Sequence, residues 1–116
     1  MVAENKVAKR VKATCKTLGL RAIRISMQPG VETGWMDYFV LGPNRHMIGI
    51  ETKATGKPAR PIQKERAREL MAYGFAWAKP DTVEDVDFTL VNFARYCMDQ
   101  PPLTREQVET MNWTQH

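Results

Sequence analysis

Two short, mostly apolar segments, residues 35–41 and 46–53, are separated only by a Gly-Pro-Asn turn at residues 42–44. Glycine, proline and asparagine favour tight turns, and strands that are joined this closely pair as an antiparallel hairpin. Each predicted strand also contains a carboxylate, Asp37 in the first and Glu51 in the second. The hairpin therefore predicts a sheet in which two acidic side chains lie on neighbouring strands.

The other periodic segments predict helices and further strands around this hairpin. Apolar residues recur at helical spacing in residues 3–18, and Gly19 follows as a C-terminal stop. Pro61 suits the first turn of a helix that Gly74 closes. The remaining predicted elements are a strand at 21–27, loops at 28–34 and 54–60, a helix at 61–73, a strand at 75–79, a helix at 82–96 and a short helix at 104–111. This order predicts an α/β fold with a mixed sheet of about four strands flanked by helices, αβββαβ plus a C-terminal helix.

Length and composition predict one globular domain over residues 1–116. Hydrophobic residues make up 43% and charged residues 26% of the chain, which is typical of a globular protein with its own core. No apolar run approaches the roughly 18–20 residues that span a bilayer, and the N-terminus lacks the apolar stretch of a signal peptide. We therefore expect no membrane association, a cytoplasmic location, and reduced thiols at Cys15 and Cys97.

Positive charge is concentrated in the first part of the chain. Residues 1–68 contain 14 Lys/Arg and 5 Asp/Glu, a net charge of +9, whereas residues 69–116 contain 3 Lys/Arg and 8 Asp/Glu, a net charge of −5. A basic surface attracts polyanions, because each phosphate that it neutralises releases condensed counterions. A solvated charged surface is the alternative interpretation. The basic residues surround the two carboxylates, and this favours a nucleic acid.

The carboxylates have the chemistry and spacing of a divalent metal site. Two carboxylates in a half-buried sheet repel each other unless a cation compensates them, and Mg²⁺ prefers oxygen ligands. Because neighbouring strands lie about 4.8 Å apart, Asp37 and Glu51 can meet one ion, with the backbone carbonyl of Thr52 as a third protein ligand. Such an ion polarises a phosphate and acidifies a bound water, so the pattern predicts phosphodiester hydrolysis.

Two further polar residues complete this predicted catalytic set. Lys53 alternates onto the face of Glu51 and can position the water or stabilise developing negative charge. Gln63 lies in the first turn of its helix, on the side of the apolar stripe, and can orient the nucleophile or the phosphate. Each residue alone has a simpler interpretation. Glu51 and Lys53 can be an exposed pair on a solvated strand, Asp37 a strand-edge polar residue, and Gln63 an ordinary first-turn residue.

The conjunction of these residues resembles the virus-type replication-repair nuclease (VRR-NUC) domain of the PD-(D/E)xK nuclease superfamily. The family pattern is a Gly-x-Pro-Asp strand, a Glu-x-Lys strand, a Gly-Lys loop, a glutamine that opens a helix and a glycine before a further strand. The matching residues are Gly34 to Asp37, Glu51 to Lys53, Gly56-Lys57, Gln63 and Gly74. The match covers about residues 3–80, with Met36 where the family usually has proline. Residues 81–116 form a C-terminal helical extension outside the pattern.

The resemblance implies a restriction-endonuclease-like core and a Mg²⁺- or Mn²⁺-dependent endonuclease that hydrolyses phosphodiester bonds in DNA. It also implies that Glu4, early in the first helix, acts beside the metal or Lys53; a simple partner of the helix dipole fits its position equally well. Stand-alone domains of this family look like small phage or bacterial nucleases and are similar to Holliday junction resolvases in forming homodimers. We therefore expect a homodimer that cuts branched or structured DNA in a bacterium or a phage-infected host cell.

The expected DNA-binding residues are basic side chains on the first helix and around the site. They are Lys9, Lys12, Lys16, Lys57, Arg60, Lys64 and Arg68. No base-reading motif is evident, so recognition is expected through shape and phosphates. Two alternatives stay open. One is a flap, nicking or other structure-dependent nuclease, and the other is a non-catalytic DNA-binding subunit.

Overall fold

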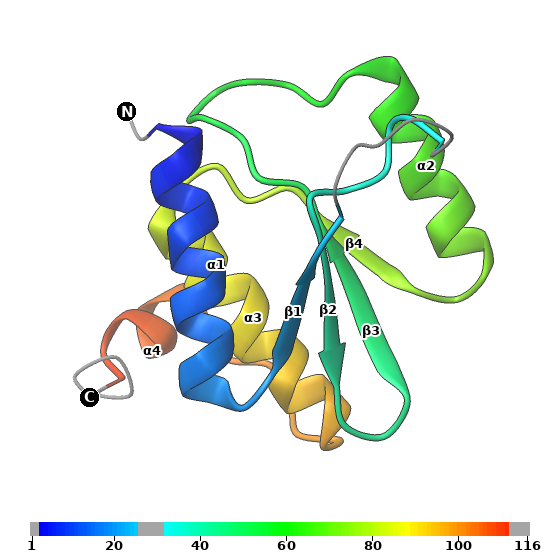
Figure 1. Ribbon diagram of the computed structural model, residues 1–116. Helices are drawn as coiled ribbons and strands as arrows, with labels where there is room; N and C mark the ends of the chain where they lie inside the picture. The colour runs from blue at the N-terminus through cyan, green and yellow to red at the C-terminus, as the bar shows by residue number, and fades with distance from the viewer. Residues whose placement is uncertain (1–2, 26–31, 112–116) are drawn as a thin grey trace.

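The computed structural model describes residues 3–25 and 32–111, and its elements follow the predicted order (Figure 1). The elements are α1 (Glu4–Leu18), β1 (Arg21–Arg24), β2 (Tyr38–Gly42), β3 (His46–Ile50), α2 (Pro61–Ala72), β4 (Ala76–Ala78), α3 (Val83–Cys97) and α4 (Arg105–Glu109). The strands form one sheet in the order β1-β2-β3-β4, antiparallel except for the parallel pair β3–β4. The prediction of an α/β fold with a mixed four-stranded sheet flanked by helices is confirmed. At this level the architecture is consistent with a restriction-endonuclease-like core.

Helices lie on both faces of the sheet (Figure 1). On one face α1 and α3 pack together, and Val11, Val40 and Leu90 belong to a single buried core. On the opposite face α2 packs through Leu70 against a smaller core that contains Met36. Successive residues of a strand point to opposite faces, so neighbouring residues at a strand end reach different helices.

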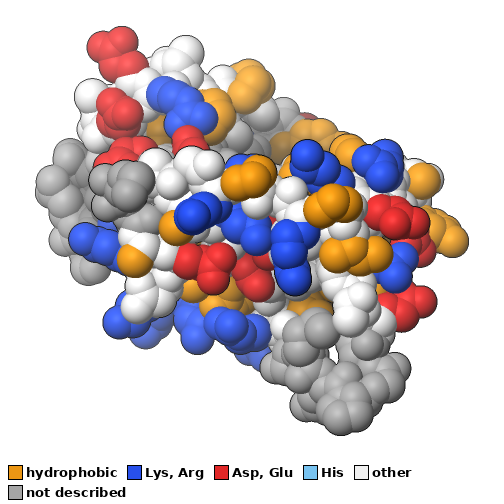
Figure 2. Space-filling model, turned by 90° about the horizontal axis from the view of Figure 1, so that it is seen from above, with side chains coloured by type: hydrophobic (Ala, Val, Ile, Leu, Met, Phe, Trp, Pro, Cys, Tyr) orange, Lys and Arg blue, Asp and Glu red, His pale blue; other side chains and the backbone are white. Residues whose placement is uncertain are grey.

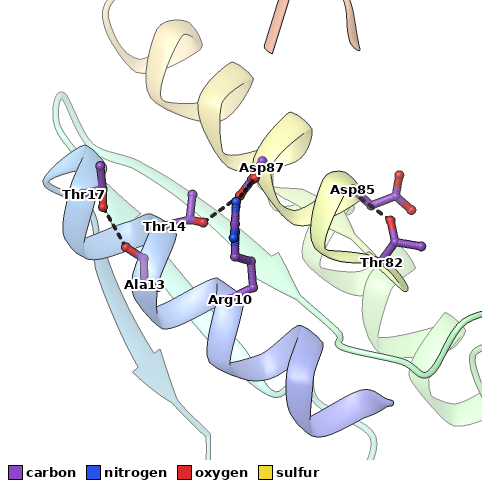
Figure 3. Close-up of polar contacts among 7 residues, drawn as sticks. All are labelled: Arg10, Ala13, Thr14, Thr17, Thr82, Asp85 and Asp87. Carbon is purple, nitrogen blue, oxygen red and sulfur yellow. Dashed lines mark hydrogen bonds and ion pairs between the residues drawn. The ribbon is translucent and has the colours of Figure 1, made fainter. Parts of the chain in front are cut away.

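A polar cluster holds α1 against α3 (Figure 3). Arg10 Nε donates a hydrogen bond of 2.9 Å to Oδ1 of Asp87, and Arg10 Nη2 forms an ion pair with Oδ2 of the same carboxylate. The hydroxyl of Thr14, a buried residue, donates a further hydrogen bond of 2.8 Å to Asp87 Oδ1. One carboxylate therefore satisfies donors from two successive turns of α1, and this helps to determine how α1 lies over the sheet.

All four strands are shorter than predicted, and in β2 and β3 this changes where the carboxylates lie. β2 begins three residues later and β3 ends three residues earlier than the sequence predicts. β1 ends at Arg24, and residues 26–27 of the predicted strand lie outside the described residues. Asp37 therefore precedes a strand and Glu51 follows one, instead of lying within them.

A hydrogen bond between the chain before β2 and the chain after β3 explains why the β2–β3 ladder ends where it does. The backbone N–H of Thr52 donates to Oδ2 of Asp37 at 2.9 Å. A side-chain oxygen thus takes the place that a backbone carbonyl of β2 would have in a continued ladder. On the other side the pairing continues, since Glu51 and Lys53 donate their N–H groups to the carbonyls of residues 78 and 80. The chain after β3 therefore stays extended beyond the end of the β2–β3 ladder.

Side-chain caps explain where the last two helices begin. The Thr82 hydroxyl accepts a hydrogen bond of 3.0 Å from the N–H of Asp85 at the start of α3. The Thr104 hydroxyl accepts one of 3.2 Å from the N–H of Gln107 at the start of α4. The C-terminal helix expected at 104–111 is thus present but shorter. None of the helices formed by residues 3–25 and 32–111 has the length and apolar character needed to cross a membrane.

Candidate functional site

The predicted site residues meet where β2 begins and β3 ends. These two ends lie side by side, because Tyr38 pairs with Ile50 in the β2–β3 ladder. Oδ2 of Asp37 accepts two hydrogen bonds from Thr52, one of 2.9 Å from the backbone N–H and one of 2.7 Å from the hydroxyl. Thr52 is buried, so these contacts hold the Asp37 carboxylate in a defined orientation at the end of the sheet.

Glu51 is held from the opposite side, by the start of α2. The side-chain nitrogen of Gln63 donates a hydrogen bond of 3.0 Å to Oε1 of Glu51. The side-chain oxygen of Gln63 accepts one of 2.8 Å from the backbone N–H of Arg60, which fixes the orientation of the amide. Glu51 and Gln63 are both buried. The side chain that caps α2 through its oxygen therefore also orients the glutamate through its nitrogen.

The segment before Asp37 packs closely against α2. Gly34 has a φ of +87°, and a Cβ at this position would lie 2.5 Å from Cγ1 and 3.1 Å from the carbonyl oxygen of Ile62. Met36, where the family pattern usually has proline, is 1% exposed and packs with Leu70 of α2. Helix α2 thus contacts the segment that leads to Asp37 and, through Gln63, the carboxylate of Glu51.

One oxygen of each carboxylate accepts no hydrogen bond from the described residues. This is the case for Oε2 of Glu51, which is buried, and for Oδ1 of Asp37. Burial, followed by the negative charge of Asp37, raises the pKa of Glu51 to about 8. The Lys53 ammonium opposes the shift. A hydrogen bond that protonated Glu51 can donate to Asp37, and then the charge of Glu4, raise the pKa further. The structure therefore brings the other three ionisable residues of the predicted set, Glu4, Asp37 and Lys53, within electrostatic reach of Glu51.

The donor atoms at this point suit a hard divalent cation. Mg²⁺ is usually bound through one or two carboxylates together with water and substrate phosphate. A cation beside Asp37 and Glu51 would satisfy the buried oxygen and offset the repulsion that raises the pKa of Glu51. Over residues 3–25 and 32–111 no three His, Cys, Asp or Glu side chains form a group that could hold a metal ion. The third predicted ligand, the carbonyl of Thr52, is a backbone group.

Lys53 and Glu4 approach the carboxylates from different elements. Lys53 follows Glu51 on the extended chain after β3, and its half-buried side chain forms no ion pair with a described residue. Glu4 is the first residue of α1 and is exposed. Both side chains can therefore reach a ligand at the site without first breaking an ion pair of the described residues.

Two cavities open at Asp37, one on each side of the sheet. The α1-side cavity has a volume of about 310 Å³, and its lining includes Glu4, Lys9, Lys12, Arg24, Tyr38 and Thr52. The α2-side cavity has a volume of about 340 Å³, and its lining includes Glu32, Trp35, Glu51, Arg60, Ile62 and Gln63. Asp37 lines both cavities, so a ligand can approach its carboxylate from either face.

The predicted DNA-binding residues are divided between the cavities and the open surface. Lys9 and Lys12 line the α1-side cavity, and Arg60 lines the α2-side cavity. The remaining four are exposed and line neither of these cavities: Lys16, Lys57, Lys64 and Arg68. Seen from above Figure 1, Lys and Arg side chains gather at the lower left and through the middle of the surface (Figure 2). Acidic side chains lie among them and at the upper left.

Arg24 is a residue of the site that the sequence did not predict. Its guanidinium lines the α1-side cavity and donates a hydrogen bond of 3.3 Å to the hydroxyl of Tyr38, its direct partner in the β1–β2 ladder. The cross-strand pairing depends on the register of β1, and the turn residues of the chain specify only the register of β2 and β3. Strand alternation gives the face of Arg24 but not its partner.

The loop at 54–60 is held by residues that follow β4. The N–H of Gly56 donates a hydrogen bond of 2.9 Å to Oδ2 of Asp81, and this contact lowers the pKa of the Asp81 carboxyl. The Lys79 ammonium donates one of 3.1 Å to the carbonyl of Lys57. The Gly-Lys segment of the resemblance is therefore fixed by backbone contacts, and the exposed side chain of Lys57 is presented to solvent.

No protein-family model matches this chain, and a search of curated proteins finds no match.

Proposed function

We propose that this chain is a Mg²⁺- or Mn²⁺-dependent endodeoxyribonuclease of the VRR-NUC type that hydrolyses phosphodiester bonds in branched or structured DNA. The observation that carries the proposal is the pair of oxygens, Oδ1 of Asp37 and Oε2 of Glu51, that accept no hydrogen bond from the described residues. The other oxygen of each carboxylate is held, by Thr52 in one case and by Gln63 in the other. Two oriented carboxylates beside a cavity that Lys9, Lys12 and Arg24 line are a setting suited to metal-dependent phosphodiester hydrolysis.

Asp37 and Glu51 would hold the cation, together with the backbone carbonyl of Thr52. When bound, Mg²⁺ or Mn²⁺ would supply a Lewis acid for the phosphate and lower the pKa of a water ligand. The two carboxylates are oriented for this role by hydrogen bonds within the protein, which Thr52 donates to Asp37 and Gln63 donates to Glu51.

The other predicted residues act on the water, the phosphate or the ligands. Lys53 forms no ion pair with a described residue, so its ammonium can bind the attacking water or stabilise negative charge on the phosphate. Gln63 acts through Glu51, because its nitrogen is used by that carboxylate and its oxygen by the cap of α2. Glu4, at the α1-side cavity, would contribute charge near the metal or Lys53.

The choice of branched DNA and of a homodimer follows the family resemblance. Two active sites of a homodimer can cut two strands of one junction. Ile23 and Leu41 offer apolar surface for a second copy, since their side chains are 38% and 39% exposed on the sheet. Such an enzyme would act in the cytoplasm of a bacterium or of a phage-infected host cell.

The test is cleavage of labelled four-way junction, flap, single-stranded and linear duplex DNA in Mg²⁺, Mn²⁺ or EDTA. Lys53→Ala should reduce cleavage by about 100-fold or more, because it removes the positive charge that stabilises the reacting phosphate. Lys6→Ala is the matched control, since Lys6 is exposed on α1 and lines neither cavity. It should stay within about twofold of the wild type.

The outcomes separate the alternatives. Metal-dependent cutting that Lys53→Ala abolishes supports the nuclease, and the preferred substrate then distinguishes a junction enzyme from a flap or nicking enzyme. DNA binding without cutting in either metal would overturn the catalytic proposal. A non-catalytic DNA-binding subunit would then be the better explanation.

A further inference from the structure

The two cavities at Asp37 differ in charge. The α1-side cavity is lined by three basic side chains and two acidic ones: Lys9, Lys12 and Arg24 against Glu4 and Asp37. The α2-side cavity is lined by one basic side chain and three acidic ones: Arg60 against Glu32, Asp37 and Glu51. A phosphate backbone is attracted to the cavity with the larger positive charge. The α1-side cavity is therefore the better path for a DNA strand.

Contacts with Tyr38 orient Arg24 at this cavity. Its guanidinium carbon lies 5.6 Å from the centroid of the Tyr38 ring, and its Nη1 donates to the Tyr38 hydroxyl. Tyr38 is 1% exposed and belongs to the core under α1 and α3, so its ring is held by packing. A guanidinium has five N–H donors, and one contact with a hydroxyl leaves most of them for an anion.

Arg24 also has no carboxylate partner among the described residues. The ion pairs of residues 3–25 and 32–111 involve three other arginines: Arg10, Arg66 and Arg105. Each of these joins elements or neighbouring turns of the fold, which is a structural role. An exposed arginine that is oriented by an uncharged partner keeps its full charge available for a phosphate.

We propose that Arg24, oriented by Tyr38, binds a phosphate of the bound DNA, and that this part of the DNA lies in the α1-side cavity next to Asp37. The inference rests on the proposed function and adds to it the path of the strand and a phosphate-binding residue. Tyr38 is a positioning residue in this arrangement, because its hydroxyl acts on DNA only through the guanidinium of Arg24.

The test compares Arg24→Ala, Arg24→Lys and Tyr38→Phe with a matched control, Arg21→Ala. Arg21 lies in the same strand and is exposed, but it pairs with Leu41 at the other end and does not line the cavity. The Kd for a labelled four-way junction is measured in Ca²⁺ at several NaCl concentrations. The values of kcat and KM are measured in Mg²⁺, and thermal melting shows which variants are folded.

Arg24→Ala should raise Kd by about tenfold and reduce the slope of log Kd against log salt by about one, because one phosphate contact is lost. Arg21→Ala should raise Kd by no more than about twofold, with the slope unchanged. Tyr38→Phe should raise Kd and KM by about threefold and leave kcat near the wild-type value, because it frees the guanidinium without removing its charge. Arg24→Lys should fall between the alanine variant and the wild type, since lysine keeps the charge without the fork geometry.

Equal Kd values and salt slopes for Arg24→Ala and Arg21→Ala would overturn this inference. If the wild type cuts DNA in that case, the proposed function still stands. If the wild type binds the junction but does not cut it, while Arg24→Ala still loses affinity and slope, the phosphate site stands and the nuclease proposal fails. A wild type that binds no DNA overturns both. If Tyr38→Phe does not fold, the comparison of Arg24→Ala and Arg24→Lys decides the question.

Discussion

The amide of Gln63 joins the start of α2 to the carboxylate of Glu51, accepting a hydrogen bond of 2.8 Å from the N–H of Arg60 and donating one of 3.0 Å to Oε1 of Glu51. Gln107 makes the same capping contact at the start of α4, where its oxygen accepts from the N–H of Thr104 at 2.8 Å, but its side chain is exposed. Gln63 is 4% exposed. Helix capping and the orientation of a candidate metal ligand therefore depend on one side chain.

Replacement of Gln63 should impair the site beyond the loss of a helix cap. Gln63→Met removes both hydrogen bonds at similar volume, and we expect metal affinity or kcat to fall by about 10–100-fold, because Glu51 loses the group that orients it. Gln107→Met removes the equivalent cap of α4 and should leave both quantities unchanged. The measurements are kcat and the Mn²⁺ concentration for half-maximal cleavage. Similar values for the two variants would show that Gln63 has only a capping role.

Divalent cations should stabilise the folded protein through Asp37 and Glu51. A ligand that binds only the folded state at about 100 times its Kd adds about 2.7 kcal/mol to the free energy of unfolding. We expect Mn²⁺ to raise Tm by several degrees over EDTA, and Asp37→Asn or Glu51→Gln to abolish this rise. Glu65→Gln, an exposed position on α2, is the charge-matched control. A Tm rise that persists in both site variants would place the cation elsewhere.

Without metal, the free energy of unfolding should fall as the pH rises from about 4.5 to about 8. The pKa of Glu51 is raised from 4.5 to about 8 in the folded protein, so the folded state holds a proton that the unfolded state has released over this range. Protonation therefore stabilises the fold below the upper value, by about 1–3 kcal/mol at the acidic end. Urea denaturation in EDTA at several pH values measures the change. In Glu51→Gln this component should be absent, so parallel curves for the two proteins would contradict the assignment.

The Asp87 carboxylate should matter far more for stability than its neighbour Asp85 in the same helix. Asp87→Ala leaves the Arg10 guanidinium and the buried Thr14 hydroxyl without their acceptor, and we expect a loss of about 2–3 kcal/mol. Asp85 pairs with Arg105 at a side chain that is 57% exposed, and Asp85→Ala should cost less than about 1 kcal/mol. Chemical denaturation measures both. Equal losses would mean that the cluster in Figure 3 does not hold α1 against α3.

The order of the elements could be predicted from the sequence because it depends on local signals. Turn residues at 42–44 specify the hairpin, and strand alternation places Glu51 and Thr52 on opposite faces, where they contact Gln63 and Asp37 respectively. The strand ends could not be predicted in this way. They are set by a side-chain acceptor on Asp37 that replaces a backbone carbonyl, and nothing in the local sequence distinguishes this from a continued ladder.

Contacts within the candidate site likewise depend on how distant elements pack. The sequence predicts Gln63 at the start of α2 but not that its amide is divided between Arg60 and Glu51, because that contact requires the helix to cross the end of β3. The sequence does not predict Arg24 as a site residue, because its contact with Tyr38 depends on the register of β1 against β2. Contacts between elements that are far apart in the chain are decided by packing, and single-sequence patterns do not contain them.

Gly34→Ala should be more harmful than Gly56→Ala, although both glycines have left-handed backbones. Their φ values are +87° and +81°, so a side chain costs about 1 kcal/mol at either position. At Gly56 a Cβ would meet nothing within 4 Å, whereas at Gly34 it would lie 2.5 Å from Cγ1 and 3.1 Å from the carbonyl oxygen of Ile62. The backbone contact cannot be relieved by a rotamer change, so α2 and the segment leading to Asp37 must move apart.

We therefore expect Gly34→Ala to lower the free energy of unfolding by about 2–3 kcal/mol and Gly56→Ala by about 1 kcal/mol. Gly34→Ala should also reduce DNA cleavage at temperatures where it is fully folded, because α2 holds Glu51 through Gln63. Combining it with Ile62→Ala removes the nearest atom and should be less damaging than the sum of the two single changes. Strictly additive losses, or equal losses for the two glycine variants, would show that the close packing of Gly34 on α2 does not position the site.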